Sequence, residues 1–366
     1  MKLPAFLKGM NFTAAIPFGR DEGFVALDIG SSSIKMVEAV GEKTGGYRLV
    51  NVGILPLPST AVQNNMVMER EVVAKTIQNL IRANGVKATK VISVVPGRAV
   101  MIKKIQLPTQ EQKELEANVE FEATNVIPEN LENVNLDYQV LNYLENGNKM
   151  EILLVAVKKD IINSYTQVIQ EAGLVPAIMD VDYFAMENMY EINYEPKPEE
   201  IIGLIHIGAC YTSINVLKNG ISTFTGDLPV GGEAFTESLM HELKVSYDQA
   251  ETFKVTGLLD GKRSMDLESL LAAACDSLSD EIRHTLSLYG SMAAEEGIHS
   301  IYLSGGSAKA PGLPRMIHEK LGVPVHLSEP FRGFAVAKNI DRDYLQDSAT
   351  ALAVGAGLAI RRPGDK

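Results

Sequence analysis

Two stretches of the chain, nearly half its length apart, follow the same pattern. The sequences VALDIGSSSIKMVEA (residues 25–39) and LIHIGACYTSINVL (residues 204–217) each pass from an apolar segment, through a polar residue and an Ile-Gly turn, into an alternating segment. In this alignment Gly30 matches Gly208. Each copy is typical of a β-hairpin whose glycine lets a ligand approach the backbone N–H groups of the turn. The repeat predicts two similar lobes that face each other.

The size and composition of the chain are consistent with two lobes. Its 366 residues are 46% hydrophobic and 22% charged, which is enough for two hydrophobic cores. The net charge of -12 argues against broad electrostatic binding to nucleic acid or to an anionic membrane. The two cysteines, Cys210 and Cys275, have no metal-type or CxxC spacing, so we expect buried thiols in a reducing compartment. No apolar run approaches the ~20 residues of a membrane-spanning helix.

Polar residues at the first turn indicate a phosphate site. Two turns rich in N–H groups would surround anionic oxygens if they faced each other. An acid beside polyphosphate is unfavourable unless a divalent cation lies between them, so we expect Asp28 to hold Mg2+ through water and Lys35 to reach a phosphate. An ordinary hairpin with an exposed acid and lysine is the alternative. The phosphate-binding residues that we predict in the two turns are Gly30, Ser31, Ser32, Ser33, Gly208, Ala209 and Thr212.

A third glycine-rich turn lies in residues 301–325, IYLSGGSAKAPGLPRMIHEKLGVPV. This stretch predicts a buried strand, a Gly-Gly turn, a helix that begins near Pro311 to Pro314, and a second strand. We expect its turn to contact the α-phosphate and the adenosine of a nucleotide, with a plain tight turn as the alternative. Its spacing matches neither the Rossmann GxGxxG pattern nor a Walker A loop. The residues predicted for this contact are Gly305, Gly306 and Ser307.

The three motifs together resemble those of the actin/Hsp70/sugar-kinase ATPase superfamily, with a first phosphate loop at 28–35, a second at 206–212 and an adenosine motif at 303–313. Within that superfamily, LDIGSSSIKMVEA is most similar to the PilM family of type IV pilus assembly, and the cell-division FtsA family is its nearest relative. The resemblance extends over nearly the whole chain after residue 20. It implies an α/β, actin-like (RNase H-like) ATPase fold in two lobes with an FtsA-type subdomain 1C, and it implies ATP and Mg2+ as cofactors.

The segment 107–141 resembles subdomain 1C, which the FtsA and PilM families carry in place of the second small subdomain of actin. Its residues independently predict a helix that is capped by Thr109 and runs to about Asn125, after which Pro128 ends the pattern. An alternating strand is predicted over residues 134–140.

Two further stretches resemble nucleotide-contacting segments of this superfamily. LPVGGEAFTESLMHEL has Gly231 and Gly232 before a predicted helix, as in the family's nucleotide-facing loop. AETFKVTG is similar to the AExxKxxxG stretch that lies against the ribose and adenine, which implies Glu251 and Lys254 at the site; a surface ion pair at helical spacing is the alternative. The small, apolar segment 347–360 resembles the C-terminal helix that packs between the lobes beneath the nucleotide.

One position departs from the superfamily pattern. Hydrolases of this fold usually begin the second phosphate loop with Asp, and here the residue is His206. His206 could contact a phosphate or be a core histidine at a strand end. In either role, a neutral imidazole cannot organise hydrated Mg2+. The acid that positions water is expected between 175 and 188, where Asp180 is the catalytic candidate and Asp182 the reserve; a helix N-cap is their alternative role. We therefore predict ATP binding with weak or absent ATPase activity.

The resemblance implies a nucleotide-gated scaffold in the assembly and alignment complex of the type IV pilus. ATP would close the lobes and set the shape of a groove between subdomains 1A and 1C, which would bind the cytoplasmic N-terminal tail of PilN. PilO is implied as an indirect partner and the cytoplasmic motor ATPase as a further candidate. The protein would then be cytoplasmic, held at the inner-membrane face only through its partners, and would bind no nucleic acid.

Two alternatives come from other functional classes. A small-molecule kinase or other phosphotransferase could use the same fold, but the sequence shows no distinct acid placed to deprotonate a substrate hydroxyl. A membrane-bound filament former similar to FtsA would need a C-terminal amphipathic helix, and the ending RRPGDK is too short and polar for one. The scaffold is therefore the preferred interpretation.

The predicted domain boundaries follow the motifs and the linker YEPKPEE. The basic, apolar leader is expected to be frayed, with a docking tail as the alternative. The predicted units are a leader at 1–20, subdomain 1A at 21–105 completed by 180–200 and 341–366, subdomain 1C at 106–178, subdomain 2A at 201–254 and 299–340, and subdomain 2B at 255–298.

Overall fold

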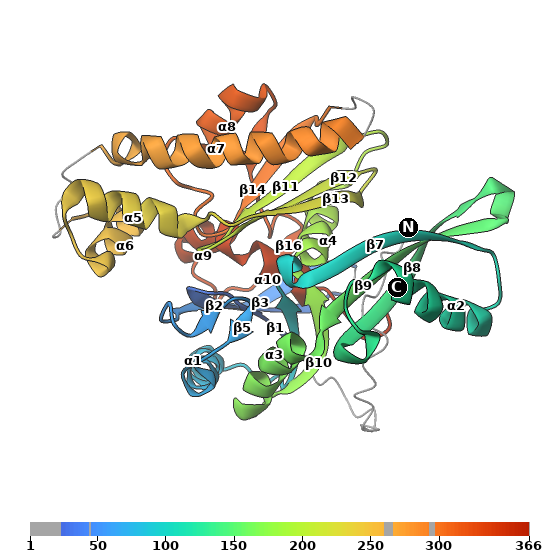
Figure 1. Ribbon diagram of the computed structural model, residues 1–366. Helices are drawn as coiled ribbons and strands as arrows, with labels where there is room; N and C mark the ends of the chain where they lie inside the picture. Colours follow the sequence, from blue (N-terminus) through green and yellow to red (C-terminus); the bar gives the residue numbers. More distant parts are fainter. Residues whose placement is uncertain (1–22, 44, 260–265, 293–296, 366) are drawn as a thin grey trace.

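The computed structural model describes residues 23–43, 45–259, 266–292 and 297–365. Two lobes lie one above the other in Figure 1, and a small subdomain projects from their side. The first lobe is built on a six-stranded sheet, the second lobe on a five-stranded sheet, and the side subdomain on a three-stranded sheet. The predicted leader at 1–20 lies outside the described residues.

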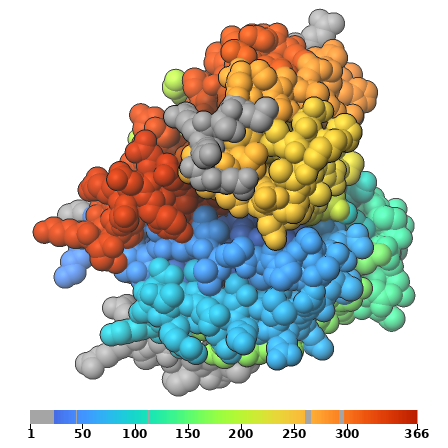
Figure 2. Space-filling view, turned by 90° about the vertical axis from the view of Figure 1, so that its left-hand side faces the viewer, coloured from blue at the N-terminus to red at the C-terminus, as the bar shows by residue number. Residues whose placement is uncertain are grey.

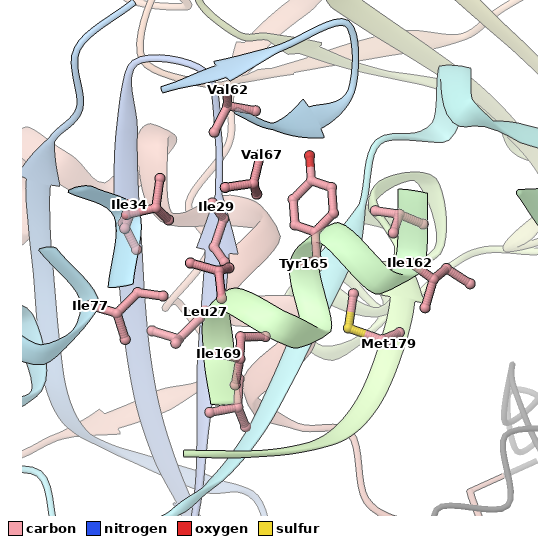
Figure 3. Packing of buried hydrophobic residues seen from close by; sticks show 14 of the residues in the cluster. Leu27, Ile29, Ile34, Val62, Val67, Ile77, Ile162, Tyr165, Ile169 and Met179 are labelled. Atoms are coloured by element: carbon pink, nitrogen blue, oxygen red, sulfur yellow. The ribbon is translucent and has the colours of Figure 1, made fainter. Parts of the chain in front are cut away.

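The first lobe has helices on both faces of its sheet. Its strands, in sheet order, are β10 (Val175–Val181), β6 (Lys90–Val95), β1 (Phe24–Ile29), β2 (Ser33–Gly41), β3 (Tyr47–Pro56) and β16 (Phe334–Val336), and its helices are α1 (Arg70–Ala83), α3 (Lys159–Glu171), α4 (Asp182–Tyr194) and α10 (Ala353–Ala359). Strand β1 is apolar on both sides because alternate residues enter opposite faces: Leu27 packs with α1 and α3, and Ala26 with α4 and α10. Figure 3 shows the first of these cores, including Tyr165 of α3.

The second lobe is likewise built on one sheet with helices packed on it, and its sheet has fewer strands than that of the first lobe. Its strands, in sheet order, are β13 (Ile221–Leu228), β12 (Thr212–Lys218), β11 (Ile201–Ile207), β14 (Ser300–Ser304) and β15 (Val325–Leu327), and its helices are α5 (Gly232–Leu243), α6 (Tyr247–Thr256), α7 (Leu267–Met292) and α8 (Leu313–Leu321). One face packs against these helices in a single core. The other face adds Leu204 and Leu217 to the core that holds α4 and α10, so apolar packing joins the lobes, which meet along a seam in Figure 2.

The side subdomain has a core of its own. Its elements are β7 (Val100–Pro108), α2 (Gln112–Val126), β8 (Val134–Leu144) and β9 (Lys149–Lys158), with the sheet order β7-β9-β8. The strand predicted over 134–140 is confirmed as part of β8. The predicted helix cap is wrong, because Glu111 occupies the N-cap position of α2. The hydroxyl of Thr109 instead donates to the carbonyl of Gly147 at 2.5 Å and ties the helix entry to the turn between β8 and β9.

The sheets divide the chain at other positions than the sequence indicated. The side subdomain spans 100–158 rather than 106–178, because α3 packs in the core of the first lobe and β10 pairs in parallel with β6. In the second lobe, α7 shares one core with the sheet, so the described residues of the predicted unit 255–298 form no separate core. Strand β16 returns the chain to the first lobe before the predicted boundary at 340, since it pairs with β3.

The C-terminal segment lies between the lobes. After α9 (Arg342–Ser348), a 3-10 turn (Ala349–Leu352) leads into α10, and buried residues of both belong to the core shared by the two lobes. Cys275 is buried in the second lobe as expected, whereas Cys210 is only partly buried. Among the described residues, no helix combines the length and the apolar character that a membrane span requires.

Candidate functional site

The two sequence repeats form hairpins with the same turn. Between β1 and β2, the N–H of Gly30 donates to the carbonyl of Ser33 at 3.1 Å. Between β11 and β12, the N–H of Gly208 donates to the carbonyl of Tyr211 at 2.9 Å. A Cβ at Gly208 would lie 3.0 Å from that carbonyl oxygen, so the tight turn favours glycine. The repeat in the sequence is therefore a repeat of backbone geometry.

Both turns open onto one cavity between the lobes. Its volume is about 550 Å³, within the usual range for sites that bind small molecules and cofactors. A short hairpin of β4 (Val62–Gln63) and β5 (Met66–Val67) borders it with Asn64 and Asn65. The predicted phosphate and metal residues that line the cavity are Asp28, Gly30, Ser31, Ser32, Lys35, Gly208 and Ala209.

The first hairpin is charged at the cavity and the second is neutral. Asp28 and Lys35 are register partners in the first hairpin, and their Oδ2 and Nζ atoms lie 3.3 Å apart. The matching partners in the second hairpin are His206 and Ser213. Burial lowers the pKa of His206 to about 4, and its Nδ1 lies 3.0 Å from the hydroxyl of Ser304. The ring is therefore neutral at neutral pH, although it lines the cavity.

The acid expected to position water lies away from the cavity. The carboxylate of Asp180 is fully buried, its Oδ2 lies 3.0 Å from Nε of Arg361, and burial raises its pKa. The reserve candidate, Asp182, does line the cavity, where its Oδ1 accepts a 2.8 Å hydrogen bond from the N–H of Gly97. Burial and the charge of Asp227 raise the pKa of Asp182 to about 8. Neither acid occupies the N-cap position of α4.

The predicted adenosine contacts lie behind the second turn. The N–H of Gly232 donates to the carbonyl of Gly208 at 2.8 Å, and a Cβ at Gly232 would lie 2.0 Å from the hydroxyl oxygen of Ser307. These close contacts hold the second turn against two glycine-rich segments. The predicted nucleotide-binding residues that do not line the cavity are Ser33, Thr212, Gly231, Gly232, Glu251, Lys254, Gly305, Gly306 and Ser307.

Glu251 and Lys254 join α6 to α5. Their Oε2 and Nζ atoms are 2.6 Å apart, which is the ion pair of the alternative interpretation. The contacts extend further, because Nζ of Lys254 also donates to the hydroxyl of Thr236 at 2.8 Å and to the carbonyl of Gly232 at 3.1 Å. The hydroxyl of Thr236 donates to Glu251 at 2.6 Å. The pair therefore supports the segment directly behind the second turn.

The sequence analysis did not identify Arg98 as a site residue. This arginine follows β6 in a 3-10 turn (Gly97–Ala99) and lines the cavity. Its Cζ lies 3.4 Å from the ring centroid of Tyr211 in the second turn, a cation–π contact between the lobes. The order of the strands could have indicated that Arg98 lies at the site. Strand β6 runs parallel to β1, and the carboxyl ends of parallel strands meet at the same edge of a sheet, so the turn after β6 lies near the first turn.

Arg98 also lines a second hollow, which we refer to as the side groove. It has a volume of about 310 Å³ and lies where the side subdomain meets both lobes. It is flanked by β7 and β13, and each of these strands lies at the edge of its sheet. The residues of the side groove are Gly97, Arg98, Val100, Met101, Ile102, Lys103, Pro128, Tyr183, Thr225 and Asp227.

The donor groups at the first turn suit a hydrated Mg2+ with a polyphosphate. Within the described ranges, no three His, Cys, Asp or Glu side chains converge as a metal cluster. Mg2+ does not require such a cluster when phosphates are present, because it keeps several waters and needs only one or two carboxylates. Asp28 supplies one largely buried carboxylate beside a turn of hydroxyl and amide groups. These residues therefore fit the cofactors implied by the sequence.

Comparison with known proteins identifies relatives over most of the chain. The family model for "Type IV pilus assembly protein PilM" matches residues 26–363. Cell division protein FtsA of Bacillus subtilis (strain 168) is 23% identical over 353 residues, which cover 85% of this chain and 79% of that protein. FtsA of Streptococcus pneumoniae serotype 2 is 24% identical over 359 residues, which cover 85% of this chain and 76% of that protein.

Solved structures have the same fold. A PilM-PilN type IV pilus biogenesis complex is similar with a TM-score of 0.80 and 27% identity, covering 94% of this chain and 99% of that chain. The ethanolamine utilization protein EutJ from Carboxydothermus hydrogenoformans is similar in fold, with a TM-score of 0.57, 16% identity, and coverage of 92% of this chain and 88% of that chain. The chain therefore belongs to the PilM family of type IV pilus assembly proteins and has their actin-like α/β ATPase fold.

Proposed function

We propose that this protein is an ATP-binding scaffold of the type IV pilus assembly complex, held at the cytoplasmic face of the inner membrane through its partners. The observation that carries the proposal is the pair of matched turns on one cavity, with Asp28 and Lys35 at only one of them. Amide groups on two sides suit polyphosphate oxygens, and the two charges suit its metal ion and one phosphate.

The phosphates of ATP are proposed to lie between the two turns. Asp28 would hold Mg2+ through water, and Lys35 would leave Asp28 for a phosphate oxygen. When bound, Mg2+ supplies positive charge that neutralises adjacent phosphates. The turns at Gly30 and Gly208 orient the phosphates with backbone N–H groups, since glycine lets the ligand come close to the chain.

The adenosine is proposed to lie against the segments behind the second turn. Support comes from the close packing of Gly232 on the side chain of Ser307, which joins two of the predicted glycine-rich segments behind the second turn. Glu251 and Lys254 are the polar groups proposed to face the ribose and the adenine. Lys254 is 14% exposed, so it needs only a small rearrangement to exchange one of its protein hydrogen bonds for a ligand atom.

The site favours ATP binding over ATP hydrolysis. His206 brings no carboxylate to the second turn, and the Asp180 carboxylate is paired with Arg361. We propose Asp182, in place of Asp180, as the acid nearest to an attacking water. Because the pKa of Asp182 is raised to about 8, its carboxyl group is mostly protonated at neutral pH and is a poor proton acceptor. Hydrolysis is therefore expected to be slow or absent.

The proposed partner is the cytoplasmic N-terminal tail of PilN, and the side groove is its proposed site. The groove lies where the side subdomain meets both lobes, and the resemblance implied a peptide groove between subdomains 1A and 1C. Val100, Ile102 and Pro128 give it an apolar wall, and β7 presents a sheet edge. An extended peptide can add to such an edge by main-chain hydrogen bonds. PilO and the motor ATPase are proposed as further components of the same complex.

Titration calorimetry with ATP and Mg2+ tests the nucleotide site. We expect binding by the unchanged protein and a loss of about 30-fold or more for Asp28→Asn, because a charge-assisted contact contributes roughly 2 kcal/mol or more. The matched control is Asp248→Asn, an exposed acid on α6, which should bind ATP normally. Absence of ATP binding by the unchanged protein would refute the proposal.

Two further measurements separate the scaffold from its alternatives. A synthetic PilN-tail peptide should be retained by the protein in the presence of ATP, and failure to retain it would argue against the scaffold. Release of phosphate, or its transfer to a small acceptor, should be near background. Phosphate release well above background that is abolished by Asp28→Ala would overturn the view of a near-inactive ATPase, whereas transfer to an acceptor would favour the phosphotransferase.

A further inference from the structure

Arg98 lies between the cavity and the side groove. It lies in the turn that joins β6 of the first lobe to β7 of the side subdomain, and it lines both the cavity and the side groove. Its guanidinium is half-buried and stacks on the ring of Tyr211. In the part of the chain that the structure describes, no carboxylate lies within ion-pair distance of it. The N–H groups of its guanidinium are therefore available to a ligand in the cavity or in the side groove.

The side groove contains a carboxylate with one oxygen that lacks a hydrogen-bond partner among the described residues. One oxygen of Asp227 on β13 accepts the hydroxyl of Tyr183, whereas the other, Oδ1, is buried and has no hydrogen-bond partner in the described structure. A buried acceptor of this kind is unfavourable until a donor arrives. Arg98 is near enough for its charge to act on Asp227, but the guanidinium is held on the Tyr211 ring instead.

The turn that carries Arg98 makes close contacts with residues that line the cavity and with residues that line the side groove. The N–H of Gly97 donates to Asp182, which lines the cavity. On the other side, a Cβ at Gly97 would lie 2.1 Å from the ring of Tyr183, which lines the side groove. A shift of this turn toward one hollow therefore moves the wall of the other, because no empty space lies between to absorb it.

A phosphate would compete successfully for Arg98. Stacking on one aromatic ring contributes about 0.5–2 kcal/mol, whereas a guanidinium can form two parallel charge-assisted hydrogen bonds with a phosphate, each roughly twice as strong as a neutral one. The terminal phosphate of a nucleotide in the cavity would thus draw the side chain away from Tyr211 and from the side groove. Asp227 would then face the groove without the positive charge of Arg98, and Lys103 would be the remaining cation of the groove lining.

We propose that Arg98 couples the two hollows: phosphate in the cavity withdraws its guanidinium from the side groove, which leaves Asp227 to bind the cationic end of an extended peptide. The peptide class follows from the unpartnered oxygen of Asp227 and the sheet edge at β7. Cytoplasmic tails of inner-membrane proteins are of this class, since they carry an excess of Lys and Arg. The inference rests on the proposed function, because it requires that both ATP and such a peptide bind.

The test measures peptide affinity with and without ATP. A fluorescent synthetic peptide that copies the PilN tail is titrated with the full chain, without nucleotide and with saturating ATP and Mg2+. For the unchanged protein we expect ATP to tighten peptide binding at least about 5-fold, the lower range of measured couplings. For Arg98→Gln we expect the ratio of the peptide affinity with ATP to the peptide affinity without ATP to lie within about 2-fold of one. The peptide affinity of the nucleotide-free variant should rise to the value of the ATP-bound protein.

Two control variants distinguish coupling from general damage. Arg82→Gln removes an exposed arginine of α1 that lies in neither hollow, and it should keep the full ratio. Arg98→Lys keeps the charge but cannot stack or form paired hydrogen bonds in the same way, so it should lose most of the ratio. Circular dichroism and ATP titration show whether each variant is folded.

The outcomes separate the inference from the proposed function. An unchanged ratio in Arg98→Gln, with both ligands bound, would overturn the coupling while leaving the scaffold intact. A ratio near one in the unchanged protein would overturn it as well. If the unchanged protein binds ATP but not the peptide, or the peptide but not ATP, the proposed function itself is wrong.

Discussion

The two hairpins that face the cavity have the same backbone and different chemistry. Each has a glycine N–H that donates to the carbonyl three residues later, at 3.1 Å in the first hairpin and 2.9 Å in the second. The side chains at the strand ends differ, since the first hairpin has Asp28 with Lys35 and the second has His206 with Ser213. The duplicated part of the two hairpins is therefore the backbone, and the charged pair at the strand ends belongs to the first hairpin.

This difference suggests a division of roles between the lobes. The first hairpin can bind charged groups, because a carboxylate and an ammonium group lie together at its base. The second hairpin, with a neutral imidazole, can offer amide and hydroxyl groups only. Hairpins of this kind could hold a metal-bound nucleotide, but the second hairpin has no carboxylate at its strand end to organise an attacking water.

The largest expected effect concerns the support behind the second turn. Gly305 has a φ of +96°, and a Cβ there would lie 2.2 Å from the carbonyl oxygen of Ile207, directly before the turn. Gly305→Ala should lower the free energy of unfolding by about 3 kcal/mol, measured by urea unfolding. In the first lobe, the residue that follows the corresponding strand β6 is Pro96 and not glycine. The sensitivity to a Cβ at this position is therefore a property of the second lobe.

Gly306→Ala is the matched control for that change. A Cβ at Gly306 would have no atom within 4 Å, so the cost should be within about 0.5 kcal/mol. Equal losses of stability in the two variants would contradict the close contact behind the second turn.

A smaller effect is expected from pH at the neutral hairpin. The folded-state pKa of His206 is about 4, below the usual 6.5, so the unfolded chain takes up this proton first as the pH falls. Stability from this group is complete above about pH 6.5 and decreases toward pH 4. Because the ring lines the cavity, we expect a loss of about 1–2 kcal/mol at pH 5, measured by urea unfolding against pH.

The variant His206→Asn isolates that contribution. It removes the titrating ring, so the difference in stability from the unchanged protein should vary between pH 6.5 and pH 5. A difference that is constant over this range would mean that the imidazole is not held neutral by the fold.

The smallest expected effect comes from making the second hairpin resemble the first. His206→Asp places a carboxylate on the neutral turn, facing the same cavity as Asp28. It should repel phosphate, so ATP affinity without Mg2+ should fall about 10-fold, or roughly 1.4 kcal/mol, in titration calorimetry. Excess Mg2+ should reduce this loss because the metal ion lies between like charges. An equal loss in His206→Asn would show that shape, and not charge, is responsible.

The hairpins could be predicted from the sequence because their geometry is local. The partners of each turn hydrogen bond are three residues apart, and strand pairing extends from there along the register. Gly30 and Gly208 therefore mark both turns without knowledge of the rest of the fold. The strands of the third motif and the helix that begins at Leu313 could be predicted for the same reason.

The choice between Asp180 and Asp182 could not be made from the sequence. Asp180 lies in the last part of β10 and Asp182 directly follows that strand, so the two acids differ mainly in their surroundings. Asp180 is enclosed with Arg361 from the far end of the chain, while Asp182 reaches the cavity beside Gly97. Burial depends on which distant segments pack against each acid, and no short pattern contains that information.

The boundaries of the side subdomain depended on similar long-range contacts. Its end at residue 158 follows from the pairing of β10 with β6, which lie about 80 residues apart in the chain. Arg98 was not identified because its partner, Tyr211, belongs to the other lobe. In each case the deciding contact joins segments that the sequence separates.

The sequence by itself determined the duplicated turns and the residue types at their strand ends, because hairpin hydrogen bonds and residue identities are local properties. The neutrality of His206 depends on its burial in the tertiary structure. The tertiary structure alone decided that both turns share one cavity, which acid reaches it, and that Arg98 lies between that cavity and the side groove. These depend on how the lobes pack, since burial and contacts between lobes arise only when distant segments come together.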